Sequence, residues 1–322
     1  MIQFHSRQRQ RKRKSVLTFV MAVFVAGCNP GDDQEIIQSD SNQQNVEISI
    51  NREIQLIAED FLALRPMRGF SHQMSVNEAY LWQDRIVEYF EADLGPVVGY
   101  KTGGHSPGPG FATFPANGIR GVILGNMIFP SGTQVTLDQT KRGFLEADFA
   151  FRVGNDSIND AQTELEVLAG LDAIIPFAEI PDPYYEEGSR SVNGTIVSNM
   201  GSRMGFVGEP VIVSATQQWL DKINNFTFAV HDEHGDLIDQ GTMAGWYKPL
   251  QVVTWLRDQL HQSGKKLSPG DLLSLGNIGI LRQLHENSPR GPAYRSDEFI
   301  LSYYGLVDEP VEVAIRIDRS KR

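Results

Sequence analysis

Two acidic residues on one predicted strand, with a third about thirty residues further on, are the side chains best suited to metal chemistry in this sequence. Glu146 and Asp148 lie in an alternating apolar and polar stretch, Phe144 to Val153, which is typical of a strand with one buried face. Residues i and i+2 of a strand point the same way and lie roughly 6.5 to 7 Å apart. Glu179 ends the apolar run that begins at Ile174. Three converging carboxylates would form half of an oxygen shell suited to Mg²⁺ or Mn²⁺, with the other positions left to water or substrate.

A pair of acids at this spacing is also common on the solvated face of a strand, where it needs no cation. Burial separates the two interpretations, because buried carboxylates that face each other repel and at least one tends to hold its proton. Glu179 ends a segment that is too apolar for a surface loop, and burying an unpaired carboxylate is costly. This neighbourhood favours a metal site.

A lysine occupies a short apolar stretch that runs into a glycine-rich turn, Val97 to Ser106. Such a turn can bring an ammonium group and backbone amides up to an anion. The stretch lacks the Gly-Lys-Ser/Thr order of a nucleotide-binding loop, so we exclude that function. Taken alone, Lys101 is also consistent with a solvated lysine, and His105 with a loop residue that has no chemical role.

The elements that must position these residues follow from periodicity and turn signals. Apolar residues at helical spacing predict a helix over 52–64, and a second helix begins near Ser75, where Glu78 completes a capping box. Further helices are predicted over 156–171, 216–224 and 250–260, and strands over 226–231, 237–240 and 311–317. Many short strands with a few helices indicate an α+β fold, with one domain over residues 51–322.

The first residues have the pattern of a bacterial export signal. Six basic residues between Arg7 and Lys14 precede an apolar run, 15–26, which is too short to span a bilayer comfortably. The run ends in Val-Ala-Gly-Cys28, which resembles a lipoprotein lipobox. This resemblance implies a signal peptide over 1–27, a lipidated Cys28 and a membrane anchor. An ordinary signal peptide with an incidental cysteine is the alternative.

Residues 28–50 are polar and nearly free of aromatic side chains, so we expect a flexible tether there. Asn29, in place of the Asp of an inner-membrane retention signal, favours the periplasmic face of an outer membrane. Cys28 is the only cysteine of the chain, which fits an exported protein without disulfides. The net charge of −11 argues against a nucleic-acid partner and against electrostatic attachment to an anionic membrane surface.

An ordered series of short motifs resembles the 2-keto-4-pentenoate hydratases of the fumarylacetoacetate hydrolase superfamily, which also includes 4-oxalocrotonate decarboxylases. The resemblance covers roughly residues 60–317, and it is carried by the order of the motifs. The motifs are Ala79-Tyr80-x-x-Gln83, Gly99-Tyr100-Lys101-x-Gly103-x-x-Ser106, Glu146-x-Asp148, Pro176-x-x-Glu179, Ser198-Asn199, Pro249-Leu250, Trp255-Leu256, Leu267-x-x-Gly270-Asp271 and Gly276.

The resemblance implies the superfamily's mixed β-sandwich roll, a homo-oligomer and a small 2-oxo or 2-hydroxy-dienoate acid as substrate. It implies that Glu146, Asp148 and Glu179 hold Mg²⁺ or Mn²⁺. Lys101 would offset the substrate's charge or pass a proton, and Ser106 and Asn199 would donate hydrogen bonds to the substrate. The implied reaction is hydration of a 2-hydroxy-2,4-dienoate to a 4-hydroxy-2-oxo acid. Decarboxylation or C–C hydrolysis of a related 2-oxo acid is the alternative.

The sequence departs from the family pattern at three positions. Asp148 stands where the family usually has Glu, which keeps the ligand type. Asn126 and Ser198 stand where the family commonly has acids. Because neither can carry a proton as a carboxyl group does, a lipid-anchored protein that binds a 2-oxo acid without converting it is a further alternative.

Overall fold

The structure is a computed structural model of the chain, and it describes residues 32–105, 118–245, 247–288 and 291–320, with side chains from residue 43 onward. The chain divides into two compact units, residues 1–48 and residues 49–322. Cys28 and Ser106 lie outside the described residues. None of the helices in the described ranges is long and apolar enough to cross a membrane.

Helix α1 (Asp32–Leu62) includes most of the segment that we expected to be a flexible tether. Residues 43–49 of this helix are exposed, and the buried side chains begin at Ile50 and continue with Ile54, Ile57 and Phe61. The expectation of an unstructured segment over 32–50 is therefore wrong, but the apolar face of the helix begins where the second unit begins.

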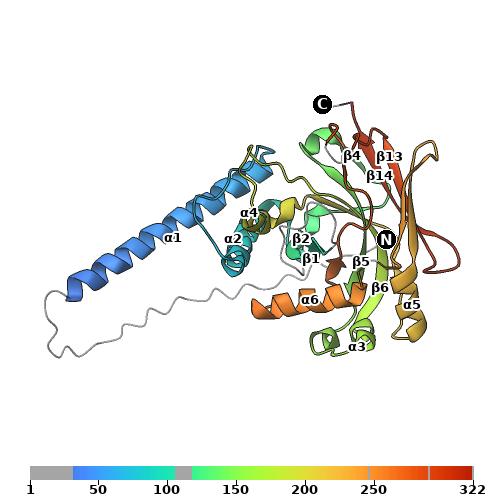
Figure 1. Ribbon diagram of the computed structural model, residues 1–322, viewed down its shortest axis with the longest axis horizontal. Helices are drawn as coiled ribbons and strands as arrows, with labels where there is room; N and C mark the ends of the chain where they lie inside the picture. Colours follow the sequence, from blue (N-terminus) through green and yellow to red (C-terminus); the bar gives the residue numbers. More distant parts are fainter. Residues whose placement is uncertain (1–31, 106–117, 246, 289–290, 321–322) are drawn as a thin grey trace. The chain divides into compact units, whose positions relative to one another are not determined.

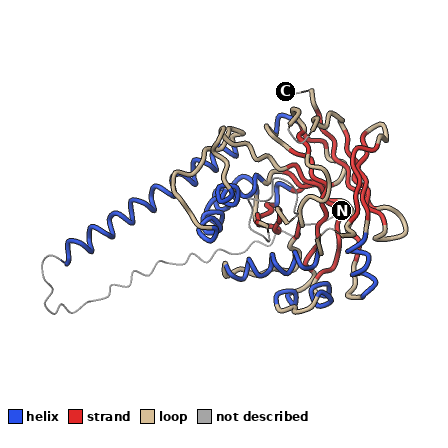
Figure 2. The backbone as a smooth tube through the Cα atoms, viewed as in Figure 1, coloured by secondary structure: helices blue, strands red, loops and turns tan. Residues whose placement is uncertain are grey.

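A nine-stranded sheet carries the candidate site (Figures 1 and 2). Its spatial order is β2 (Ile119–Leu124), β1 (Val97–Gly103), β11 (Leu272–Ser274), β5 (Phe144–Val153), β6 (Leu171–Ile180), β7 (Met204–Val207) and β3 (Ile128–Pro130), with β12 (Arg282–Gln283) paired to β5 and β8 (Val211–Ile212) paired to β6. Strands β1 and β11 are parallel, whereas β11, β5, β6 and β7 pair antiparallel.

A second sheet of five strands has the order β10 (Leu237–Thr242), β9 (Thr227–Asp232), β13 (Glu298–Tyr304), β14 (Val311–Asp318) and β4 (Gln134–Thr136). The helices that flank the sheets are α2 (Val76–Leu94), α3 (Glu164–Ala169), α4 (Val192–Val197), α5 (Gln217–Asn225) and α6 (Pro249–Gln262). Figure 1 shows α2 and α4 beside β1 and β2, and α3, α5 and α6 beside β5 and β6. The expected α+β fold is confirmed.

The two faces of β5 have different surroundings. Ala147, Phe149 and Phe151 point into the main hydrophobic core, where the ring of Phe149 packs edge-on against Phe226 at 5.1 Å. Ala150 on the opposite face belongs to a smaller apolar cluster with residues such as Phe177. Because side chains alternate along a strand, Glu146 and Asp148 share this second face.

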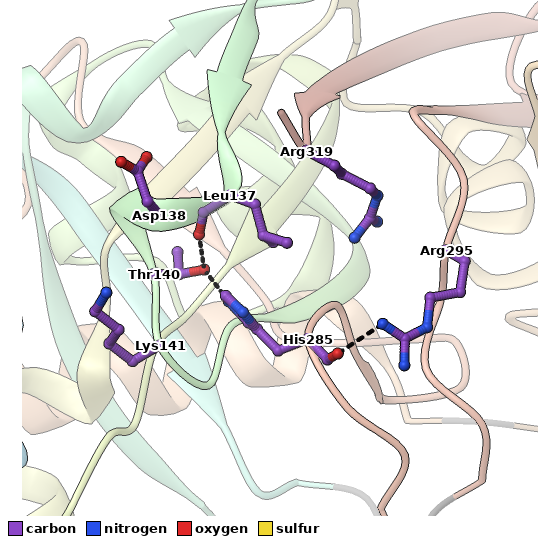
Figure 3. Close-up of a pocket in the computed structure, with 7 residues that line it drawn as sticks. All are labelled: Leu137, Asp138, Thr140, Lys141, His285, Arg295 and Arg319. Atoms are coloured by element: carbon purple, nitrogen blue, oxygen red, sulfur yellow. Dashed lines mark hydrogen bonds between the residues drawn. The ribbon is translucent and has the colours of Figure 1, made fainter. Parts of the chain in front are cut away.

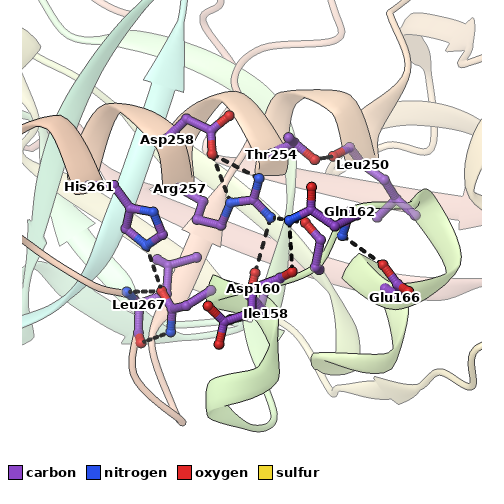
Figure 4. A network of polar contacts seen from close by, with 12 residues as sticks. Ile158, Asp160, Gln162, Glu166, Leu250, Thr254, Arg257, Asp258, His261 and Leu267 are labelled. Carbon is purple, nitrogen blue, oxygen red and sulfur yellow. Dashed lines mark hydrogen bonds and ion pairs between the residues drawn. The ribbon is translucent and has the colours of Figure 1, made fainter.

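The helix predicted over 156–171 is wrong in its extent. The structure has a 3₁₀ turn, η3 (Asp156–Asn159), then α3, and Leu171 already belongs to β6. A residue of α6 stabilises this interruption. Arg257 donates hydrogen bonds to the carbonyls of Ile158 and Ala161, at 3.3 and 2.5 Å (Figure 4). These contacts are long-range, so local periodicity did not reveal them.

Candidate active site

The three carboxylates selected from the sequence lie on one face of two neighbouring strands. Glu146 of β5 is directly opposite Glu179 of β6 in the antiparallel register, and Asp148 follows two residues along β5. Directly opposed residues point to the same face, so the register brings all three acids together. Asp148 and Glu179 are buried, with 0 and 3% of their surface exposed, and Glu146 is half-buried.

Lys101 reaches this face through two strand pairings. It is in register with Ser274 of β11, and Ser274 is in register with Ala150 of β5. Lys101 is 2% exposed, and its ammonium group donates to a carboxylate oxygen of Glu179. A buried charge of either sign is costly unless it is paired. The ion pair therefore explains how both groups remain inside the protein.

The environment of Lys101 favours its charged form. Burial opposes the ammonium charge, but Glu179, Glu146 and Asp148 outweigh it and raise the pKa of Lys101 above its ordinary value. Lys101 is consequently a cation at neutral pH, surrounded by acids and shielded from water.

The environment of Asp148 favours its neutral form. Burial raises the pKa of Asp148 well above its ordinary value, and the charge of Glu179 adds to the effect. Hydrogen bonds from the Ser274 hydroxyl and, at 2.6 Å, from the Phe149 amide work against this rise.

Ser274 is a site residue that the sequence analysis missed. Its side chain is 0% exposed, and its hydroxyl donates to Asp148. Ser274 ends the apolar strand Leu272–Ser274, directly after the Gly270-Asp271 motif. A lone polar residue within an apolar strand was the signal that could have found it.

The donor set fits a hard divalent cation, because it consists of carboxylate oxygens. In the described parts of the chain, however, no three His, Cys, Asp or Glu side chains are close enough together to hold a metal ion. The carboxylate of Glu179 accepts a hydrogen bond from Lys101, and that of Asp148 accepts one from Ser274. A cation held by this set would share or replace those two contacts.

Asn199 lies beside Lys101 but is bonded to the backbone. Its side chain accepts from the amide of Val122 at 2.6 Å and donates to the carbonyl of the same residue at 2.8 Å. A Cβ placed on Gly121 would lie 3.0 Å from Asn199 Oδ1 and 3.2 Å from Lys101 Cγ. Asn199 therefore holds strand β2 against the lysine, and both polar groups of its amide are already engaged.

The Ala79-Tyr80-x-x-Gln83 motif forms a structural junction. Gln83 is 0% exposed and donates to the carbonyls of Arg120 and Ile196, at 2.9 and 2.7 Å. The Tyr80 hydroxyl accepts from the Arg120 amide at 3.2 Å. The motif thus joins α2 to β2 and to α4.

The two positions that lack the family's acids have neutral contacts. Asn126 is exposed and donates to the Asp93 carbonyl at the end of α2, at 3.0 Å. It lies in the 3₁₀ turn η1 (Gly125–Met127), five residues past Gly121, the partner of Lys101 in β1. Ser198 is buried and lies 2.6 Å from the Tyr185 hydroxyl.

His105 lies in an aromatic corner. Its ring packs edge-on against Trp255 at 4.8 Å and lies 6.2 Å from Tyr247. Burial lowers the pKa of His105 to about 4, so the imidazole is neutral at physiological pH. Its Nε2 atom is buried without a hydrogen-bond partner among the residues described. The structure thus shows His105 packed rather than solvated.

The fold as a whole matches solved structures of a decarboxylase. A 4-oxalocrotonate decarboxylase from Pseudomonas putida G7, complexed with magnesium and adipate, aligns with a TM-score of 0.70 at 17% identity, over 84% of this chain and 98% of that one. The same enzyme complexed with calcium and acetate aligns with a TM-score of 0.69 at 18% identity over the same shares. At these identities the likeness establishes the mixed α+β fold.

The chain is also similar in sequence to two hydratases. The TodF product hydratase of Pseudomonas putida is 24% identical over 187 residues, which are 58% of this chain and 65% of that protein. The 2-keto-4-pentenoate hydratase 1 of Dechloromonas aromatica is 24% identical over 162 residues, 49% of this chain and 59% of that protein. The matches therefore span less than two thirds of these relatives. No family model matches the chain.

Proposed function

We propose that this protein is a metal-dependent hydratase that adds water to a 2-hydroxy-2,4-dienoate to give a 4-hydroxy-2-oxo acid. The observation that carries the proposal is the buried Lys101–Glu179 pair on the face that also bears Glu146 and Asp148. The similarity to hydratases supports this reaction class.

Glu146, Asp148 and Glu179 would hold the divalent ion, Mg²⁺ or Mn²⁺. When bound, it would supply positive charge that stabilises the enolate form of a 2-oxo acid. Lys101 would offset the substrate carboxylate or transfer a proton along the conjugated chain. Ser274 keeps Asp148 oriented, and Asn199 positions the strand beside Lys101. Ser106 remains our proposed hydrogen-bond donor to the substrate.

The test follows the ultraviolet absorbance of 2-hydroxypenta-2,4-dienoate with the full-length chain, stripped of metal and then supplied with Mg²⁺ or Mn²⁺. We expect metal-dependent loss of absorbance above the spontaneous rate, and none with Glu146→Ala. Glu209→Ala is the matched control, because Glu209 is exposed and is not on the carboxylate face.

Two other outcomes are informative. If the dienoate is stable but oxalate or pyruvate binds only with metal, the site binds 2-oxo acids and the hydratase proposal is wrong. If Glu146→Ala binds metal as tightly as the unmodified chain does, the proposed assignment of the metal site to these carboxylates is wrong.

We further propose that Cys28 is lipidated and anchors the protein to the periplasmic face of an outer membrane. The Val-Ala-Gly-Cys pattern supports this proposal. Cys28→Ala should move the protein from the membrane fraction to the soluble fraction after cell lysis. Equal membrane association of both forms would refute it.

A further inference from the structure

A basic pocket that shares no residue with the carboxylate site lies between the segment after β4 and the segment that joins β12 to β13 (Figure 3). Its volume is about 270 Å³. Lys141, His285, Arg295 and Arg319 line it, together with one acid, Asp138. The net charge of the chain is −11, so three permanent cations around one cavity make the charge there opposite to that of the whole chain.

Arg319 is fixed in the wall of the pocket. Its guanidinium donates to the carbonyls of Leu284, Tyr294 and Ser296, at 2.9, 3.0 and 2.9 Å. Bonds to neutral carbonyls orient the guanidinium without cancelling its charge. Arg319 also pairs with the Asp297 carboxylate at 3.4 Å, and because that carboxylate is 71% exposed, solvent screens this pair. Arg319 therefore contributes a rigidly held positive charge.

Arg295 and Lys141 bring two further cations to the same cavity. Arg295 donates one hydrogen bond, to the His285 carbonyl at 2.8 Å, out of the five N–H groups that a guanidinium carries. The ring of His285 is held by Thr140, 2.7 Å away. Lys141 is exposed, and its side chain has no ion-pair partner among the described residues.

Among the residues that line the pocket, the one acid does not balance the three cations. Asp138 contributes a single negative charge against three positive ones. Figure 3 shows its carboxylate pointing away from the two guanidinium groups. The interior of the pocket is therefore suited to an anion.

We propose that the pocket binds a compact oxyanion with two negative charges, such as hydrogenphosphate or a small dicarboxylate. Planar guanidinium groups match the geometry of phosphate and carboxylate oxygens, and Lys141 adds a charge that can move toward the ligand. The cavity, of about 270 Å³, has room for an ion of this size. This inference is independent of the reaction at the carboxylate site.

Isothermal titration of the full-length chain tests the proposal, with inorganic phosphate in one arm and succinate in the other. The titrations are made without divalent cations, in chloride buffer at constant ionic strength. We expect saturable binding of one ion per chain in at least one arm, and the tighter arm identifies the ligand as phosphate or carboxylate.

Arg295→Gln and Lys141→Gln should each weaken this binding about tenfold, as expected for loss of one charged hydrogen-bond donor. Lys266→Gln is the matched control, because it removes the same charge from an exposed residue outside the pocket and should leave the affinity unchanged. Lack of saturable binding in both arms would overturn the proposal, as would an affinity in both pocket variants equal to that of the unmodified chain.

Discussion

Lys101 is the residue on which the candidate active site most depends. Its ammonium is the counter-ion of Glu179, and both groups are almost wholly buried. Removing one partner of a buried pair leaves an uncompensated charge, which typically costs about 3 to 5 kcal/mol. A cation bound by the carboxylates would replace part of what is lost.

Lys101→Met should therefore lower the free energy of unfolding of the metal-free chain by about 3 to 5 kcal/mol. Added Mg²⁺ should recover part of this loss, whereas turnover should stay reduced about a hundredfold or more. Urea unfolding with and without Mg²⁺ measures the first effect. Lys266→Met is the control, and an unchanged unfolding midpoint for Lys101→Met would contradict the ion pair.

Asp148 makes the stability of the metal-free chain depend on pH. Its raised pKa means that the folded state holds a proton that the unfolded state loses above about 3.8. Folding stability therefore falls as the pH rises from 3.8 toward the raised pKa. Asp148→Asn cannot ionise, and Asn can still bond to Ser274 and to the Phe149 amide.

We expect Asp148→Asn to change the melting temperature little near pH 4 and to raise it increasingly toward pH 8, measured without metal. Asp172→Asn is the control on the same sheet: its side chain is 43% exposed and pairs with Arg152, so it should give no such gain. A difference in melting temperature between Asp148→Asn and the unmodified chain that does not vary with pH would contradict the raised pKa of Asp148.

At the scale of elements, α2 is fixed to the sheet through Gln83. This side chain satisfies two buried carbonyls, and its own oxygen accepts from Arg120 at 3.1 Å. Arg120 is fully buried and stacks over the Tyr80 ring at 4.3 Å. Because Arg120 belongs to β2, the strand that pairs with β1, the junction supports the strand that carries Lys101.

Gln83→Leu should leave these groups without partners and lower the free energy of unfolding by about 2 to 4 kcal/mol, because each unsatisfied buried polar group costs roughly 1 to 3 kcal/mol. Chemical unfolding followed by circular dichroism measures the loss. Gln262→Leu, at an exposed position in the last turn of α6, should stay close to the unmodified chain. Equal losses in both variants would contradict a role for the junction.

At the scale of the whole molecule, the second unit, residues 49–322, contains both the main core and the carboxylate face. Among the described side chains of α1, those of residues 43–49 are exposed and the first buried one is Ile50. A chain that begins at Ser49 should therefore keep the melting temperature and the Mg²⁺ response of the full-length protein. Differential scanning calorimetry of the two forms checks this, and a loss of several degrees would show that residues 1–48 support the fold.

Local patterns in the sequence determined the elements and the faces of single strands. The alternation over 144–153 predicted β5 and the shared direction of Glu146 and Asp148, and Ser75 with Glu78 predicted the start of α2. These features depend on neighbours two to four residues apart, so periodicity and capping chemistry are sufficient to read them.

Only the tertiary structure decided what surrounds those residues. Ser274 reaches Asp148 because β11 lies between β1 and β5, a strand order that no local pattern specifies. Asn199 bonds to both backbone groups of Val122, and the helix predicted over 156–171 is interrupted where Arg257 binds its carbonyls. Each outcome depends on a partner more than seventy residues away, since hydrogen bonds and burial join groups that the fold alone brings together.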